Sequence, residues 1–175
     1  MKNLFLISIL LIVSHIVVAQ NSVTDYLGTW KGESGDTIFT ITLIQGDTLY
    51  NNTLINVLGG YSIAVKGEII DDYLNINTHR IPNRNLVGQN IYIDAAYHLP
   101  AEQYLGFMFY DQRKKHFNGE GILGGVMKLI TFNQLHWTLD EKYGIWHKIE
   151  GDEDAEEVQP IGFSVPTDII LTKVE

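Results

Sequence analysis

Apolar and polar side chains alternate with a period of two along much of this chain, and no other feature limits its possible folds as strongly. In the segment 37–44, Phe39, Ile41 and Leu43 fall on one face of an extended strand, and the residues between them fall on the other. Similar short runs recur between turn signals, and no long segment has the i, i+3, i+4, i+7 spacing of an amphipathic helix. The sequence therefore predicts an all-β, antiparallel fold with about eight to ten strands.

Short turns separate the predicted strands. Residues 29–33 and 37–44 are expected to form a first hairpin, and residues 45–47 should end its second strand in a tight turn. Such strands can build an up-and-down barrel or a β-sandwich, and closure into a barrel would remove the sheet edges on which β-proteins aggregate. The further strands are expected at 61–69, 73–77, 90–98, 104–110, 119–130 (as a strand pair or a bulged strand), 134–140 and 169–174.

The N-terminal segment has the pattern of a cleaved export signal. A lysine at position 2 is followed by an apolar stretch, and the small residue Ala19 then precedes Gln20. The apolar stretch is interrupted and shorter than the roughly 20 residues of a membrane span. We therefore expect residues 1–19 to be removed between Ala19 and Gln20, and residues 20–175 to form a single secreted or periplasmic domain.

Composition excludes several classes of function. The chain has no cysteine, so it can form neither a disulfide nor a thiolate metal site. Its net charge of −9 at pH 7 repels phosphate backbones, and nucleic acid is therefore not an expected partner. The acidic loop 150–157 lacks the central glycine and final glutamate of an EF-hand, and we interpret it as a solvated insertion. No membrane span is expected in the mature chain, because no later apolar run is long enough.

Gly28, Thr29 and Trp30 lie at the start of the first predicted strand. This start resembles the Gly-x-Trp signature of the lipocalins, and the resemblance implies a lipocalin-like up-and-down barrel. In that family the glycine permits a tight bend and the tryptophan closes the barrel floor, often under a late arginine. The late cation here is Lys173, whose stacking on Trp30 would contribute about 0.5–1 kcal/mol. Gly28, Trp30 and Lys173 are thus the expected barrel closure, with Trp30 as an ordinary core residue being the alternative.

The layout of the whole chain resembles an uncharacterised family of small exported proteins of the Bacteroidetes type, a domain of unknown function. The features that carry this resemblance are the signal ending in Ala19-Gln20, the Gly-Thr-Trp start, the repeated short strands and the closing segment 165–173. The resemblance implies no active site.

No motif specifies a reaction, a metal or a cofactor. The histidines do not follow a His-Glu-x-x-His or comparable spacing, and a zinc site needs three or four converging ligands. Within each acid pair, 71–72 and 140–141, the two side chains would point to opposite faces of a strand. We interpret both pairs as turn acids. A carboxylate-dependent hydrolase whose acids converge only in the fold is an alternative. We expect no cofactor, no metal and no catalytic residue.

The aromatic residues favour a binding function. In a wide barrel some of them would line an apolar pocket with a few polar groups, whereas in a narrow barrel they would fill the core. The ligand-binding residues of this hypothesis are Tyr92, His98, Tyr104, Phe107, Phe109, His136 and Trp137.

One basic cluster, residues 113–116, is interpreted as a solvated turn, and docking of an acidic partner or a lipid head group is its alternative role. The sequence thus indicates an exported, non-enzymatic protein that binds a small apolar ligand in the barrel or a protein partner at its aromatic mouth. A structural envelope protein without a ligand is the remaining alternative.

Overall fold

The computed structural model describes residues 22–49, 54–78, 90–97, 104–119, 121–140 and 160–174. The predicted signal segment 1–19, the acidic loop 150–157 and His98 lie outside these ranges. No helix among the described residues is long and apolar enough to cross a membrane. The elements are α2 (Val23–Tyr26), β1 (Gly28–Ser34), β2 (Thr37–Leu49), β3 (Leu54–Val65), β4 (Glu68–Asp72), β5 (Ile93–Tyr97), β6 (Tyr104–Phe109), the 3-10 helix η1 (His116–Gly119), β7 (Ile122–Thr131), β8 (Gln134–Leu139) and β9 (Asp168–Val174).

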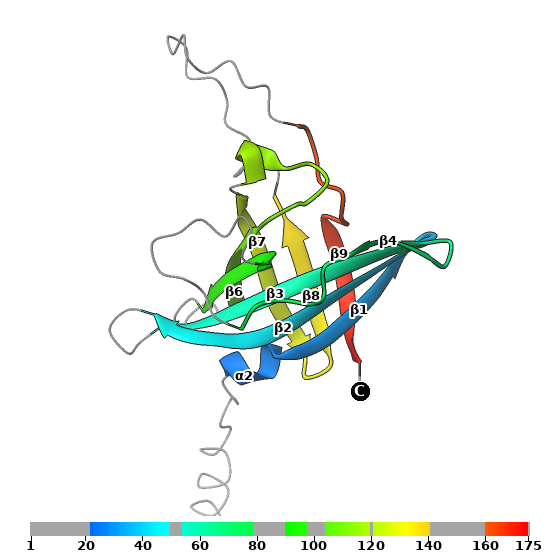
Figure 1. Ribbon diagram of the computed structural model, residues 1–175. Coiled ribbons are helices and arrows are strands. Elements are labelled where there is room, and N and C mark those ends of the chain that lie inside the picture. The colour runs from blue at the N-terminus through cyan, green and yellow to red at the C-terminus, as the bar shows by residue number, and fades with distance from the viewer. Residues whose placement is uncertain are drawn as a thin grey trace, which may run out of the picture.

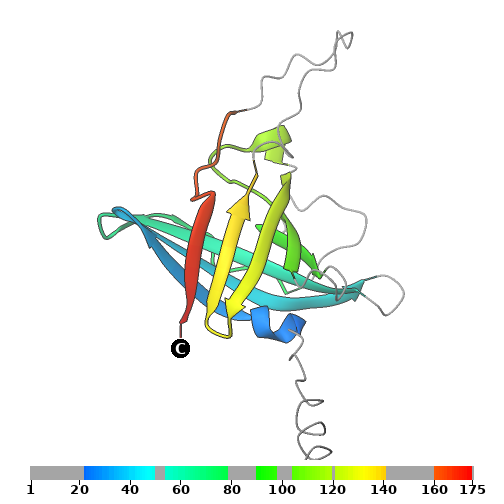
Figure 2. The same ribbon diagram turned by 180° about the vertical axis from the view of Figure 1, so that it is seen from behind.

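Within the described residues, nine strands form one antiparallel sheet in the order β2-β1-β9-β8-β7-β6-β5-β3-β4. Because β2 also pairs with β3, eight of the strands close into an up-and-down barrel, and β4 is an additional strand outside the closed ring (Figure 1). Seen from behind, β7, β8 and β9 form the opposite wall of the barrel (Figure 2). The predicted all-β, lipocalin-like barrel is confirmed, and the sandwich alternative is wrong.

Aromatic side chains from several strands meet in the middle of the barrel. Trp137 is fully buried, and its ring centroid lies 4.4 Å from that of Phe107, 5.2 Å from that of Phe39 and 5.7 Å from that of Phe109. Every second residue of β6 and β8 is buried, as the period-two pattern requires. This level of the barrel interior is therefore filled by packed rings.

The glycine-containing segment 45–47 does not form the predicted turn. Strand β2 continues through it to Leu49 and stays paired with β3, with a shift of register between Gln45 and Thr48. An extra residue in one strand can be absorbed by a bulge, which bends the strand without ending it. The glycine and aspartate of this segment thus serve a β-bulge.

The predicted strand 61–69 is in fact the end of β3, a two-residue turn and the start of β4. Lys66 and Gly67 have φ values of 52° and 83°, the left-handed pair that a type I′ hairpin turn requires. Strand β3 also begins earlier than predicted, at Leu54. This hairpin turns the chain back along β3 and brings Asp71 opposite Ile63.

Helix α2 lies at one end of the barrel (Figure 1). Ser22 and Asp25 form a capping box at its start, and Trp30 Nε1 donates a hydrogen bond of 2.8 Å to the Tyr26 carbonyl. Lys173 Nζ lies 5.0 Å from the centroid of the Trp30 ring. Gly28 has φ +117°, and a Cβ there would be 3.2 Å from Lys173 Cε, so both the bend and the close approach suit glycine.

Candidate functional site

Strand β3 changes its pairing partner at the segment from Gly59 to Tyr61. Its first half pairs with β5 and its second half with β4. Between these pairings, Tyr92 N–H donates to the Gly59 carbonyl at 2.9 Å, and Tyr73 N–H donates to the Tyr61 carbonyl at 2.8 Å. The chain leaving β4 and the chain entering β5 therefore meet at the same point of the barrel wall.

Three tyrosine rings gather at this point. The ring centroids of Tyr61 and Tyr73 are 5.2 Å apart, those of Tyr73 and Tyr92 are 5.0 Å apart, and those of Tyr61 and Tyr92 are 6.1 Å apart. Tyr61 is fully buried and lies 5.1 Å from the ring of Phe109, whereas Tyr73 and Tyr92 are only partly buried. This group, which we call the tyrosine cluster, connects the buried aromatic core to the surface.

A buried carboxylate lies beside the tyrosine cluster. Asp71 is 8% exposed and pairs in register with the buried Ile63, so it shares the inner face with that residue. Its Oδ2 atom lies 2.9 Å from Arg113 Nε, but this is an ion-pair contact, because no donor of the described residues is aligned with that oxygen for a hydrogen bond. A buried carboxylate needs a compensating charge, and Arg113 supplies it here.

A second buried carboxylate, Asp111, organises the turn that carries Arg113. It accepts hydrogen bonds from Arg113 N–H at 3.0 Å and Lys114 N–H at 2.9 Å. It also accepts two bonds of 2.7 Å from Ser164, one from the backbone N–H and one from the hydroxyl. Asp111 thereby joins the turn after β6 to the segment that precedes β9.

His116 is the third buried polar side chain at this end, and it is 1% exposed. Its Nε2 lies 2.9 Å from the Gly162 carbonyl, which can only accept, so Nε2 carries the proton. Its Nδ1 has no hydrogen-bond partner in the part of the chain that the structure describes. The ring lies 5.4 Å from that of Phe163, which in turn lies 6.3 Å from Phe109. The end of the barrel that carries His116, Phe163 and Phe109 lies opposite α2, and we call it the aromatic end (Figure 1).

The phenols of the tyrosine cluster stay neutral well above neutral pH. Burial raises the pKa of Tyr61, nearby Asp111 and Asp71 raise it further, and the hydrogen bond from Gln112 N–H to its hydroxyl opposes this. Burial also raises the pKa of Tyr73 and of Tyr92, and Asp71 adds to the effect at Tyr73. At neutral pH the partly buried Tyr73 and Tyr92 therefore present rings and neutral hydroxyls.

The predicted ligand-binding residues fall into three groups. Tyr92 belongs to the tyrosine cluster. Phe107, Phe109 and Trp137 lie in the packed core, where Phe109 also contacts Tyr61 of the cluster. Tyr104 and His136 alternate with buried residues and so face outward, where His136 Nε2 donates to Asp168 Oδ1 at 2.7 Å. The structure does not bring these residues together as one set, and His98 lies outside the described residues.

Sequence reasoning did not select Tyr61, Tyr73, Asp71 or Asp111 for this site. The sequence places Tyr61 in a predicted strand and Asp71 in a pair of turn acids, whereas the structure places Asp71 in β4 with 8% of its surface exposed. The sequence signal that could have predicted this site is the Lys66-Gly67 pair, which suits a two-residue hairpin turn. A hairpin at that position brings Asp71 and Tyr73 beside Tyr61.

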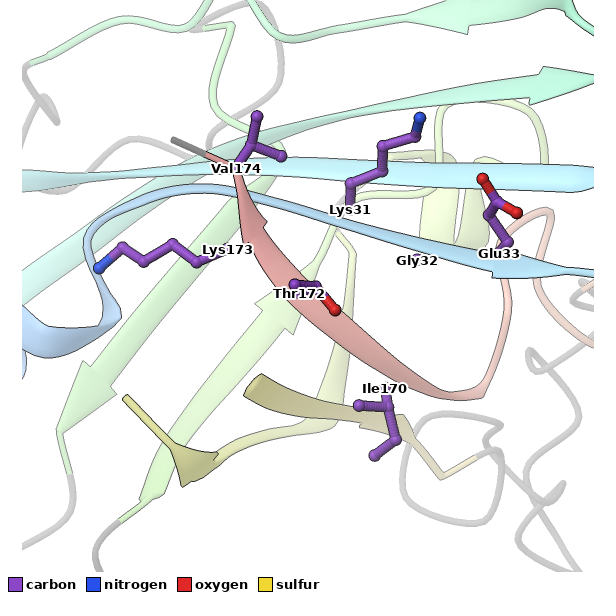
Figure 3. Close-up of a pocket in the computed structure, with 7 residues that line it drawn as sticks. All are labelled: Lys31, Gly32, Glu33, Ile170, Thr172, Lys173 and Val174. Atoms are coloured by element: carbon purple, nitrogen blue, oxygen red, sulfur yellow. The ribbon is translucent and has the colours of Figure 1, made fainter. Parts of the chain in front are cut away.

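The outer wall of the barrel has a shallow hollow of about 370 Å³ over β1 and β9. Figure 3 shows its lining: Lys31 and Glu33 extend from β1, and Ile170, Thr172 and Val174 from β9. These are outward side chains of adjacent strands, and the hollow contains neither a buried charge nor an aromatic ring. The aromatic end is therefore the stronger candidate site. Among the described residues no group of three or more His, Asp or Glu side chains is placed to hold a metal ion.

Comparison with known proteins identifies a family. Residues 1–174 match the model of a family of unknown function, DUF6705, and the chain belongs to that family. The expected resemblance to a domain of unknown function is thus confirmed. Neither the curated proteins nor the solved structures contain a match.

Proposed function

We propose that this member of the DUF6705 family is a non-enzymatic binding protein that holds a small, mainly apolar ligand at the aromatic end of its barrel. One observation carries the proposal: the partly buried rings of Tyr73 and Tyr92 lie where β3 changes partner, in contact with the buried Tyr61. Partly exposed aromatic rings beside a few fixed polar groups are typical of small-molecule sites.

The polar groups at this end favour binding over catalysis. Asp111 is held by four donors, and Asp71 is paired with Arg113. Carboxylates held by fixed partners orient their surroundings, whereas a general acid or base must lie within hydrogen-bond reach of the proton that it transfers. We therefore prefer a binding protein to a carboxylate-dependent hydrolase or to a structural envelope protein without a ligand.

We also propose that the protein is exported, as the resemblance to small Bacteroidetes-type exported proteins implies. The described structure begins at Ser22, so cleavage between Ala19 and Gln20 would leave every described element in place. Intact mass spectrometry of protein purified from the cells that make it tests this proposal. A chain that begins at Gln20 supports it, and a mature chain that retains residues 1–19 contradicts it.

Fluorescence titration with the neutral probe N-phenyl-1-naphthylamine tests the binding site. We expect saturable binding, weakened about threefold to tenfold by Tyr73→Ala or Tyr92→Ala, because each removes one aromatic contact. The matched control is Phe132→Ala, which removes an 84% exposed ring from the turn between β7 and β8. This turn lies at the α2 end, away from the proposed site, because Lys173 N–H donates to the carbonyl of the neighbouring Asn133.

Two outcomes would contradict the binding proposal. One is the absence of saturable binding, and the other is an equal loss of affinity in the Phe132→Ala control and in the two tyrosine variants. Native mass spectrometry of protein from its own cells provides an independent check, because a copurified small molecule that is lost from Tyr73→Ala would support the same site.

A further inference from the structure

The basic turn Arg113, Lys114 and Lys115 lies at the aromatic end, although the chain as a whole is acidic. The two carboxylates that contact this turn are buried: Asp111 is occupied by four hydrogen bonds, and Asp71, paired with Arg113, is 8% exposed. The Arg113 side chain, in contrast, is 49% exposed. Among the described residues, the charged side chains that this turn exposes are therefore cationic.

Arg113 is held in a defined orientation. Its backbone N–H is bonded to Asp111, which fixes the main chain, and its Nε lies 2.9 Å from Asp71 Oδ2, so an ion pair holds the head of the side chain beside Asp71. Among the described residues, the two Nη nitrogens of Arg113 have no acceptor. A guanidinium whose ion pair is made at Nε leaves its two Nη atoms as a planar pair of donors, the geometry that fits a carboxylate.

The tyrosine cluster lies next to this guanidinium. Gln112, the residue before Arg113, donates its N–H to the Tyr61 hydroxyl at 3.0 Å, and Asp71, which pairs with Arg113, is two residues before Tyr73. The Tyr73 ring in turn lies 5.0 Å from that of Tyr92. A fixed cation and two partly buried rings thus adjoin each other.

We infer that Arg113, Tyr73 and Tyr92 form a site for a small aromatic carboxylate, with the carboxylate on the Arg113 guanidinium and the ring on the two tyrosines. This inference rests on the proposed binding function and specifies the class of ligand. A planar monoanion matches one guanidinium edge, and a flat ring matches the aromatic surfaces beside it. Asp71 is a positioning residue in this site, because it acts through Arg113.

Three probes of similar size test the ligand class: 2-naphthoate, its neutral isostere 2-naphthamide and the cation 2-naphthylmethylammonium. Isothermal titration calorimetry of the purified protein is expected to show 2-naphthoate binding about tenfold tighter than 2-naphthamide, and the cation binding weakest. Equal affinity for acid and amide, or tightest binding of the cation, would overturn the inference.

Two variants separate recognition by the guanidinium from general attraction by positive charge. Arg113→Lys keeps the charge but loses the planar pair of donors, so it should weaken 2-naphthoate about tenfold and leave 2-naphthamide unchanged. Lys115→Gln removes an exposed charge of the same turn and should change the affinity for 2-naphthoate by less than about twofold. The reverse ranking of the two variants would show a nonspecific charge effect and refute the site.

The titration with N-phenyl-1-naphthylamine distinguishes failure of this inference from failure of the proposed function. If the neutral probe binds at the tyrosine cluster while 2-naphthoate gains nothing from Arg113, only the carboxylate assignment is wrong. If neither probe binds, the proposed binding function is wrong as well.

Discussion

Lys173 lies over the ring of Trp30, with its Nζ atom 5.0 Å from the ring centroid. The same ammonium donates a hydrogen bond of 3.3 Å to the Asp25 carbonyl, and Trp30 Nε1 donates to the Tyr26 carbonyl. The final strand, the first strand and α2 are therefore joined at one end of the barrel by two side chains. The late cation of the Gly-x-Trp resemblance is here a lysine.

Substituting this lysine should weaken the α2 end measurably. We expect Lys173→Met to lower the free energy of unfolding by about 0.5–1 kcal/mol, because it removes the cation–π contact and keeps the aliphatic stem. Chemical denaturation followed by tryptophan fluorescence measures the change. Lys128→Met, an exposed lysine of β7, is the control, and an equal loss in both variants would show that the Trp30 contact contributes nothing.

Asp111 should be among the most important polar residues for stability. The Asp111 carboxylate accepts hydrogen bonds from three backbone N–H groups and from the Ser164 hydroxyl. Asp111→Asn replaces one of its two oxygens with an NH₂ group, which cannot accept these bonds. We expect a loss of about 2–3 kcal/mol in the free energy of unfolding. Hydrogen exchange should increase first in 111–114 and 162–166. Asp168→Asn, which alters an exposed carboxylate bonded to His136, should cost much less.

The barrel could be predicted from the sequence because it depends on a local pattern. In 134–140, the alternation alone placed Leu135 and Trp137 inward, and both are fully buried. A strand that must bury one face shows that requirement in every second residue. The bulge at 45–47 could not be distinguished from a turn, because both use glycine and aspartate.

The candidate site could not be predicted in the same way, because it depends on residues far apart in the sequence. Asp111 and Ser164 are 53 positions apart, and nothing near either residue indicates the other. The sequence favours a turn at Asp71-Asp72, since an Asp-Asp pair looks the same in a turn as at the end of a hairpin strand. The partner change of β3, which gathers the tyrosine cluster, is a property of the whole sheet.

Tyr61 should make the protein sensitive to alkali. Burial raises its pKa in the folded state, so above about pH 10 the unfolded chain releases the phenolic proton while the folded chain retains it. The unfolded state then binds fewer protons, and the free energy of unfolding falls by up to about 1.4 kcal/mol per pH unit from this group. Below that pH both states keep the proton, and the effect is absent.

Tyr61→Phe isolates this contribution. At neutral pH the variant should be about 1 kcal/mol less stable than the wild type, because Gln112 N–H loses its acceptor. The difference should shrink between pH 10 and about pH 11, where only the wild type loses stability through this phenol. Urea denaturation at each pH measures both proteins, and a constant difference would contradict the raised pKa.

Gly125 should tolerate no side chain, because it faces the Phe107 ring that packs on Trp137. A Cβ at Gly125 would overlap that ring, so Gly125→Ala should cost about 1–3 kcal/mol and change the near-ultraviolet circular dichroism of Trp137. Gly67→Ala is the matched control: φ is +83° and nothing lies within 4 Å, so it should cost about 1–2 kcal/mol of backbone strain and leave that spectrum unchanged.

Because the overlap involves the ring itself, combining Gly125→Ala with Phe107→Leu should cost less than the sum of the two single changes. Additive losses would show that Gly125 is needed for its backbone and not for the space it leaves to Phe107.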